Sequence, residues 1–463
     1  MTATTKSADL LIEGATVITM DAERRIFSDG AIAIGGGRIT AVGQRREVVP
    51  TIQAERQIPG QGKVVIPGLI NAHSHFFPFL SGAIPDEHPA DIVRRDYLYP
   101  FFRDLSAEEE VVGAKARMWE MIRTGTTCFT DGGCKHLDRV AEAVEEMGLR
   151  GVLGRWRCDR AENGDPPREG YGIQSDAERI LEELEDDLRT RGRTSDRVRA
   201  AAALVDERVV SDELLRGAAE LVGRYQTTLS VDVGVTKAAG GGDGTGRKEG
   251  LRPVQRLKAL GVLGRRVILN HATVLDPEDV TAVAEADAGV CWTPSAALRR
   301  GHGTTQTGMI PELVKAGVGV ALGTDGPACS DYADMVRVMY LAATLPVDSR
   351  ISHAASSSET ALEMGTVNGA KALGLAEEIG SLETGKKADL VMLDVDRPEW
   401  RPLFHVVNNL VYSATGDSVH TVIVDGRVVM DANRLMVADE AELLEAAQSL
   451  RKEMRKRLAR YPL

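Results

Sequence analysis

Short apolar segments alternate with amphipathic ones through the middle of the chain. Runs rich in Val, Ile, Leu and Ala are each followed by a stretch whose apolar residues recur at helical spacing, and strands joined by helices in this way indicate a parallel sheet. Eight such runs occur, at residues 64–73, 126–131, 150–155, 198–205, 227–235, 266–271, 289–293 and 319–325. Eight strands of this kind predict an α/β fold with a closed (β/α)8 barrel.

The segments between these runs carry helix signals. In residues 105–125, Ser106 and Glu109 have the spacing of a capping box, and Gly125 marks the end of the helix. In residues 175–193, glutamates precede arginines at helical spacing, as on a solvent-exposed face. Helices of this kind suit the outer layer of a barrel.

The two ends of the chain show a different pattern, in which apolar and polar residues alternate with a period of two. Three glycines at 35–37 and the pair Asp425 and Gly426 are typical of hairpin turns between such strands. We therefore expect the two ends to form one small β-sandwich domain together. The predicted division is residues 1–66 and 377–436 for the β domain, 67–376 for the barrel and 437–463 for a C-terminal helix.

Composition and charge argue against several classes of protein. The 463 residues are 43% hydrophobic and 27% charged, without an apolar run near twenty residues, which is typical of a soluble globular protein and predicts no membrane span. The first residues lack a basic region followed by an apolar stretch, so we expect a cytoplasmic location. A net charge of −12 disfavours nucleic acid as a partner.

The cysteines do not form a recognisable pattern. Their number is odd and their spacing is scattered, which favours reduced thiols used in packing over a disulfide framework or a cysteine zinc site. They are Cys128, Cys134, Cys158, Cys291 and Cys329.

Polar residues at the ends of the predicted strands point to a metal centre, because reactive groups of a barrel gather at the C-terminal ends of its strands. His73 and His75 end the first strand, and a His-x-His spacing places both imidazoles on the same side of a strand. Asp232 lies on the fifth strand, His271 ends the sixth and Asp325 ends the eighth. Imidazole with carboxylate suits zinc, cobalt, iron or manganese, so we predict one divalent ion as cofactor.

Several of these residues have an alternative interpretation. A His-x-His pair also occurs by chance on a surface or in a core. Asp232 is a direct metal ligand, a ligand through water, an orienting neighbour, or a buried structural carboxylate. His88 and His302, in the loops after strands one and seven, are candidates to contact substrate, although loop histidines are commonly just solvated. Trp292 is expected either to line the substrate pocket or to pack in the core.

Six segments of the chain together resemble the amidohydrolase superfamily, in the branch that contains s-triazine hydrolases, guanine deaminase and cytosine deaminase. They are VVIPGLINAHSH, TGTTCFTDGG, ILNHATVLDPEDV, TPSAALRRG, VALGTDGPACSDYADM and GSLETGKKADLVMLD, and they cover nearly the whole chain. The resemblance implies that His73 and His75 are first-strand metal ligands, that His271 is the sixth-strand histidine and that Asp325 is the eighth-strand aspartate. It also implies a homo-oligomer.

The chain departs from that branch on the fifth strand, where the resemblance leads one to expect His-x-x-Glu. Asp232 and Val235 occupy these two positions, and valine cannot transfer a proton. Val274 and Trp292 replace two further histidines, which makes the expected pocket more apolar. Ring deamination needs a proton donor, so these departures favour a different electrophile, as in the phenylurea hydrolase and molinate hydrolase group that the chain also resembles.

We therefore predict a metal-dependent hydrolase that cleaves the carbonyl C–N or C–S bond of a small urea or thiocarbamate. In this hypothesis Asp325 accepts the proton of the attacking water, and His271 steadies the developing oxyanion. Two alternatives remain at this point: a deaminase or chlorohydrolase of triazine or nucleobase type, and a non-catalytic scaffold.

Overall fold

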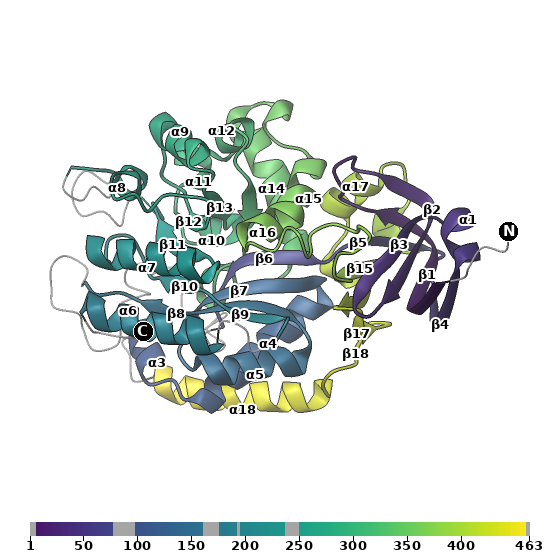
Figure 1. Ribbon diagram of the computed structural model, residues 1–463, viewed down its shortest axis with the longest axis horizontal. Helices are drawn as coiled ribbons and strands as arrows, with labels where there is room; N and C mark the ends of the chain where they lie inside the picture. The colour runs from purple at the N-terminus through teal and green to yellow at the C-terminus, as the bar shows by residue number, and fades with distance from the viewer. Residues whose placement is uncertain (1–5, 77–97, 161–175, 192–194, 237–249, 460–463) are drawn as a thin grey trace.

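The molecule contains two large sheets that lie side by side (Figure 1). The structure is a computed structural model that describes residues 6–76, 98–160, 176–191, 195–236 and 250–459. One sheet forms the barrel, and the other is built from both ends of the chain. Within the described residues, no helix is long and apolar enough to cross a membrane.

The barrel sheet confirms the predicted α/β fold. Its strands pair in parallel in the order β14-β13-β12-β11-β10-β8-β7-β6, and β9 pairs with β8, so that β9 and β10 are two pieces of the fourth strand. The strands are β6 (Leu69–Ser74), β7 (Thr126–Cys134), β8 (Arg150–Arg157), β9 (Val198–Ala200), β10 (Ala202–Leu204), β11 (Leu229–Val233), β12 (Val267–His271), β13 (Gly289–Trp292) and β14 (Val320–Leu322).

Helices surround this sheet and follow its strands in turn (Figure 1). The predicted capping box is present at the start of α4, where Ser106 and Glu109 bond each other's backbone N–H groups. The longer helices are α4 (Ala107–Arg123), α5 (Leu137–Met147), α6 (Ala177–Arg191), α7 (Asp212–Tyr225), α8 (Pro253–Ala259), α9 (Pro277–Glu285), α14 (Met335–Arg350), α15 (Ser358–Gly365) and α18 (Glu440–Leu458). Shorter ones are α3 (Tyr99–Arg103), α10 (Pro294–Arg299), α11 (Thr304–Thr307), α12 (Ile310–Lys315), α13 (Pro327–Ser330) and α16 (Val367–Ala372).

The first and last strands of the barrel meet where β6 passes the end of β14. The Asp325 N–H donates to the carbonyl of His73 at 2.9 Å. The Asn71 side chain bonds Thr324 twice: its Nδ2 donates to Thr324 Oγ1 at 2.8 Å, and its Oδ1 accepts from the Thr324 backbone N–H at 3.0 Å. Gly323 allows this approach, because a Cβ there would come within 2.7 Å of the His73 carbonyl. The closure therefore brings the two ends of the barrel sheet together at His73 and Asp325.

The second sheet joins the two chain ends in the order β18-β17-β16-β15-β5-β1-β2-β3, with β4 beside β1. Its strands are β1 (Lys6–Ile18), β2 (Ile26–Gly35), β3 (Arg38–Gln44), β4 (Ile52–Pro59), β5 (Lys63–Pro67), β15 (Leu390–Asp394), β16 (Val419–Val424), β17 (Arg427–Asp431) and β18 (Arg434–Leu435). A fully buried ion pair between Arg150 and Asp389, bonded at 2.9 and 3.1 Å, ties this sheet to strand β8. The predicted contribution of both chain ends to one sheet is confirmed.

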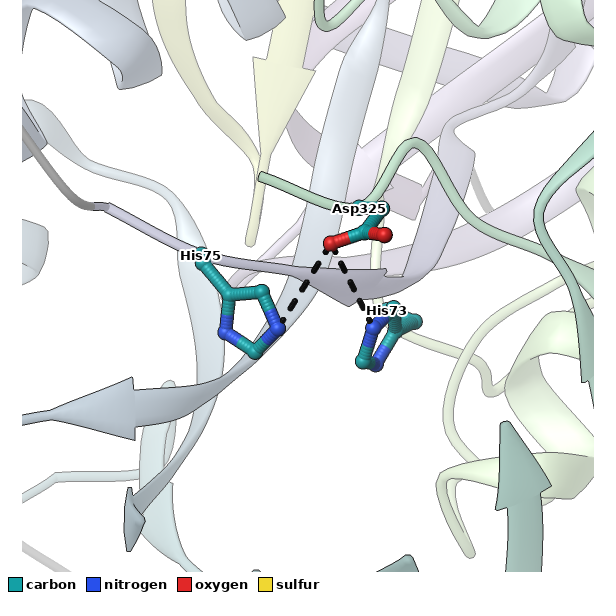
Figure 2. A group of neighbouring side chains, drawn as sticks. All are labelled: His73, His75 and Asp325. Carbon is teal, nitrogen blue, oxygen red and sulfur yellow. Dashed lines mark ion pairs between the residues drawn. The ribbon is translucent and has the colours of Figure 1, made fainter. Parts of the chain in front are cut away.

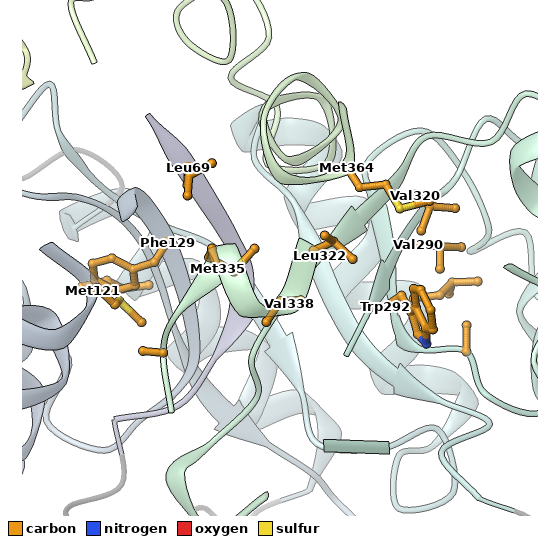
Figure 3. Packing of buried hydrophobic residues seen from close by; sticks show 14 of the residues in the cluster. Leu69, Met121, Phe129, Val290, Trp292, Val320, Leu322, Met335, Val338 and Met364 are labelled. Carbon is orange, nitrogen blue, oxygen red and sulfur yellow. The ribbon is translucent and has the colours of Figure 1, made fainter. Parts of the chain in front are cut away.

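Two apolar layers show which way the strand side chains face. The interior cluster contains residues from strands all around the barrel, namely Ile70, Ala72, Cys128, Val152, Ala201, Ile268, Cys291 and Ala321. The outer cluster lies between the strands and the helices, and it includes Leu69, Phe129, Val290, Trp292, Val320 and Leu322 (Figure 3). Because strand side chains alternate, membership in one cluster fixes the direction of the neighbouring residues.

Candidate metal centre

A β-bulge in β6 turns the His-x-His pair into the barrel. Ile70 and Ala72 belong to the interior cluster, so strict alternation would direct His73 outward. The pairing of β6 with β7 shifts between Asn71 and Ser74, where three steps along β6 match two along β7. The extra residue reverses the alternation, and His73 and His75 then face the barrel mouth.

His73, His75 and Asp325 form a buried triad. Figure 2 shows both imidazole rings turned toward the Asp325 carboxylate: Oδ1 lies 3.8 Å from His73 Nε2 and 3.7 Å from His75 Nε2. The ring centroids of the two histidines are 4.8 Å apart. These three side chains offer donor atoms within 4.8 Å of one another, a spacing that fits one shared ion.

A second triad shares His73 with the first and adds Asp232 and His271. His271 Nε2 lies 3.4 Å from Asp232 Oδ2, and its ring centroid is 5.0 Å from that of His73. Since Ile268 faces the interior, alternation places Asn270 there and would turn His271 away. The backbone of His271 instead adopts a left-handed conformation with φ of 64°, as does Asp325 with φ of 61°. All five predicted metal residues therefore converge on one place.

Side chains that sequence reasoning missed hold these groups in position. The Asp131 carboxylate accepts hydrogen bonds from the N–H groups of Phe76 and Gly133, and its Oδ1 lies 3.6 Å from His75 Nδ1. Thr293 Oγ1 is 2.8 Å from His271 Nδ1, and Asn270 Nδ2 donates to Asp232 Oδ1 at 3.0 Å. Orienting partners of this kind are the usual companions of metal-binding residues. Each lies in or directly after the C-terminal half of a barrel strand, which was the available signal in the sequence.

The electrostatics favour ionised carboxylates, whereas the imidazoles differ from one another: in spite of burial, Asp131 raises the pKa of His75 and Asp232 raises that of His271. Burial lowers the pKa of His73 to about 3, so its ring is neutral at physiological pH. The pKa of Asp325 falls to about 2 in spite of burial, because the charge of His271 stabilises its ionised form. Burial also opposes ionisation of Asp232, but His271 lowers the pKa of that carboxyl. Neutral nitrogen and anionic oxygen donors are the forms that bind a divalent metal.

The residues present fit such a metal. His73 Nε2 is buried and has no hydrogen-bond partner within the described residues, although a buried ring nitrogen normally has one. Imidazole and carboxylate together are borderline donors, suited to zinc and its neighbours rather than to calcium or copper(I). A cation among His73, His75, Asp325, Asp232 and His271 would supply the missing partner.

A further buried carboxyl lies at the end of the fourth strand. Glu207 is 4% exposed, and its N–H donates to the carbonyl of Asp232 at 3.1 Å. Burial raises the pKa of Glu207 well above its ordinary value, and the charge of neighbouring Asp206 acts in the same direction. Glu207 comes three residues after the end of strand β10, and its place in the sequence gave no indication of this burial.

The remaining predicted site residues have mixed outcomes. His302 is buried, with its ring centroid 6.2 Å from that of His271, so it lies near the metal residues. Of the two alternatives for Trp292, the structure favours core packing: because Cys291 faces the interior, Trp292 points outward and packs with Val290 beneath the helices (Figure 3). Its indole N–H donates to Thr304 at 3.0 Å. His88 lies outside the described residues.

Comparison with known proteins agrees with this geometry. The model of the amidohydrolase family matches residues 64–429 of the 463 in the chain. The chain belongs to the amidohydrolase family. It is a hydrolase that acts on carbon–nitrogen bonds and uses a divalent metal ion, as predicted. The further resemblance to phenylurea and molinate hydrolases is not confirmed.

Similar proteins share nearly the whole length of this amidohydrolase. A 5-methylthioadenosine/S-adenosylhomocysteine deaminase of Thermoanaerobacter pseudethanolicus is 31% identical over 440 residues, which are 94% of this chain and 97% of that protein. A 5′-deoxyadenosine deaminase of Methanothermobacter thermautotrophicus is 32% identical over 445 residues, 96% of this chain and 98% of that protein. A zinc-bound adenosine deaminase structure from Xanthomonas campestris has a TM-score of 0.90 at 27% identity, covering 98% of this chain and 100% of that one.

These relatives correct the predicted reaction. Cleavage of a urea or thiocarbamate was inferred from Val235, because the chain lacks a glutamate where a proton donor was expected. That inference is wrong, since the similar full-length proteins are named as deaminases of adenosine-type nucleosides. One missing side chain does not exclude a reaction when other buried carboxyls lie in the same site. The non-catalytic scaffold is likewise not supported, and the deaminase alternative accounts better for the comparisons.

Proposed function

We propose that this amidohydrolase removes the exocyclic amino group from the adenine ring of a nucleoside. Water adds to the ring carbon that bears the amino group, the carbon–nitrogen bond breaks, and ammonia leaves while a ring carbonyl remains. The observation that carries this proposal is near-full-length similarity, at 31 to 32% identity, to deaminases of adenosine derivatives. The buried histidine and carboxylate donors described above provide the metal centre that such a hydrolysis requires.

The proposed metal residues are His73, His75 and Asp325, joined by Asp232 and His271. Zinc is the ion proposed for them, because the donors are imidazole and carboxylate and because the similar Xanthomonas structure contains zinc. A divalent ion held by these residues would lower the pKa of a bound water to roughly 7 and so make a nucleophile available at neutral pH.

Asp325 is proposed to accept the proton of that water and to deliver it to the departing amine. Its low pKa keeps it ionised, and Oδ1, the oxygen that faces both imidazoles, also accepts the N–H of Gly326, which limits rotation of the carboxylate. His271 is proposed to orient the reacting groups, since Thr293 holds its Nδ1 side and leaves Nε2 facing Asp232. His302, beyond His271, is proposed to contact the substrate.

The test is an assay for released ammonia with the metal-loaded enzyme. Adenosine, 5′-deoxyadenosine and 5-methylthioadenosine are compared with cytosine, guanine and a phenylurea. We expect ammonia from at least one adenine nucleoside, with the corresponding inosine derivative as product, and loss of activity after chelation that zinc or cobalt restores. Absence of ammonia from every adenine nucleoside under these conditions would overturn the proposal.

Substitution of Asp325 tests the assigned proton transfer. Asp325→Asn keeps the shape of the side chain but removes its basic oxygen, so kcat should fall by about 10²–10⁴-fold while circular dichroism stays unchanged. Turnover near the wild-type rate would contradict the role of Asp325. The predicted homo-oligomer also stays a prediction, which analytical ultracentrifugation would check.

A further inference from the structure

Glu110, in the first turn of α4, is a buried carboxylate that binds the chain at the end of strand β7. The residue is 2% exposed. Its Oε1 accepts the N–H of Lys135 at 2.7 Å, and its Oε2 accepts the N–H of His136 at 2.7 Å and lies 2.7 Å from His136 Nδ1. Burying a carboxylate is costly unless hydrogen bonds compensate, and here both oxygens bind two consecutive residues. Glu110 therefore fixes the position of these two residues relative to α4.

The segment that Glu110 holds is irregular, so the sheet alone does not fix it. The pairing of β7 with β8 shifts between Asp131 and Cys134, where three steps along β7 match two along β8. Such a bulge leaves a residue outside the ladder of hydrogen bonds. The bulge contains Gly132 and Gly133, and glycine has more backbone freedom than any other residue. An anchor outside the sheet is therefore needed, and the Glu110 carboxylate supplies one directly after the bulge.

The bulge begins at Asp131, which lies against the metal residue His75. Asp131 Oδ1 accepts the N–H of Gly133 at 2.7 Å and lies 3.6 Å from His75 Nδ1. The position of the Asp131 carboxylate thus depends on Gly133, inside the bulge whose far end Glu110 holds. A continuous series of contacts therefore leads from Glu110 through the bulge to the Nδ1 side of His75, and Nε2 of the same ring faces Asp325.

We propose that Glu110 is a positioning residue of the metal centre: its carboxylate fixes the bulged end of β7, so that Asp131 holds the His75 ring with Nε2 toward the shared ion. Loss of a partner that orients a metal-binding imidazole typically weakens metal binding by about 10- to 100-fold. Glu110 acts one step further out and touches neither the ion nor the substrate. The inference concerns the metal centre itself and does not depend on which substrate is hydrolysed.

Zinc affinity of the full-length protein, measured by competition with a chromophoric chelator, tests this role without an assay of activity. Glu110→Ala removes the acceptor of two backbone N–H groups and should bind zinc about 10-fold more weakly, at the lower end of the effect of an orienting partner. Glu109→Ala is the matched control, because this neighbouring carboxylate on the same helix bonds Ser106 and Arg457 instead. Its zinc affinity should stay within about twofold of wild type, since independent sites do not couple. An affinity for Glu110→Ala within about twofold of wild type, or equal losses in both variants, would overturn the inference.

A double substitution shows whether the effect passes through Asp131. Asp131→Ala should itself weaken zinc binding, because it removes the partner of His75. Adding Glu110→Ala to it should cost less than about threefold more, since residues that act through one another are not additive. Full additivity of the two losses would overturn the inference.

Melting temperature is measured on every variant, because Glu110 is buried. If Glu110→Ala does not fold, Glu110→Gln decides the matter: it keeps the shape and one acceptor oxygen but turns an NH2 group toward a backbone N–H. Weaker zinc binding by the folded Gln variant supports the inference, and wild-type affinity would overturn it. The visible absorption of the cobalt-loaded protein reports the arrangement of ligands around the ion. It should change in the Glu110 variant and not in Glu109→Ala, and an unchanged spectrum in both would overturn the inference.

Discussion

The closure of the barrel gives a quantitative prediction, because one side chain both closes the sheet and aligns the metal residues. Asn71→Ala removes two hydrogen bonds to Thr324, one to its hydroxyl at 2.8 Å and one from its backbone N–H at 3.0 Å, and both residues are 0% exposed. The Thr324 hydroxyl keeps the carbonyl of Asp325 as a partner, but the Thr324 N–H is left buried and unpaired. An orphaned buried donor costs about 1–3 kcal/mol and the second lost bond about 1 kcal/mol, so the free energy of unfolding should fall by about 2–4 kcal/mol.

The assay is urea denaturation of the metal-free and the metal-loaded protein. Asn71 lies two residues before His73, and Thr324 precedes Asp325, so the variant should also bind zinc about 10- to 100-fold more weakly, as expected when an orienting contact is lost. Asn368→Ala is the control, since it removes a single half-buried bond, from Asn368 Nδ2 to the carbonyl of Val320 at 3.0 Å, and should cost about 1 kcal/mol. The reasoning is refuted if Asn71→Ala changes stability by less than the control and leaves zinc affinity intact.

Three further predictions concern buried groups outside the metal centre. Burial raises the pKa of Glu207, so the folded protein keeps a proton that the unfolded chain releases above the ordinary pKa of 4.5, and this group lowers the stability of the fold as pH rises. In urea titrations, the stability of Glu207→Gln relative to wild type should therefore increase between pH 5 and 8. A difference that stays constant over this range would show that Glu207 is ionised in the folded protein. Asp389→Ala leaves Arg150 buried without its partner and should lower the free energy of unfolding by about 3–5 kcal/mol, whereas a loss below 1 kcal/mol would mean that water reaches the guanidinium. Burial raises the pKa of Cys128 and Cys158 to about 12, so their thiolate fraction at pH 8 is about 10⁻⁴. Four of the five thiols are buried, so at most one should react quickly with a disulfide reagent until the protein is unfolded. Several fast-reacting thiols in the folded protein would contradict this prediction.

The amino-acid sequence by itself determined the architecture and provided the candidate metal residues. Apolar runs and helical periodicity are local properties, and the eight runs correspond to the barrel strands because each buries its own side chains. The His-x-His pair and Asp325 were recognisable because a barrel gathers its reactive groups at strand ends. The capping box of α4 was equally local, since its two partners are three residues apart.

The reaction could not be read from one position. Val235 at the expected place of a proton donor suggested a substrate that needs no such donor, but Glu207, Asp325 and Asp131 are buried carboxyls that other strands bring to the same end of the barrel. Their convergence depends on the order of strands in the sheet rather than on spacing along the chain. Similarity to full-length deaminases is what favours the deaminase alternative.

Tertiary structure alone decided the direction in which the site residues point. The bulge in β6 and the left-handed backbone at His271 each reverse an alternation that the sequence would extend unchanged. The same effect placed Trp292, which was expected either at the pocket or in the core, beneath the helices. Alternation of side chains is a property of one strand, but which face is inside is set by closure of the whole barrel.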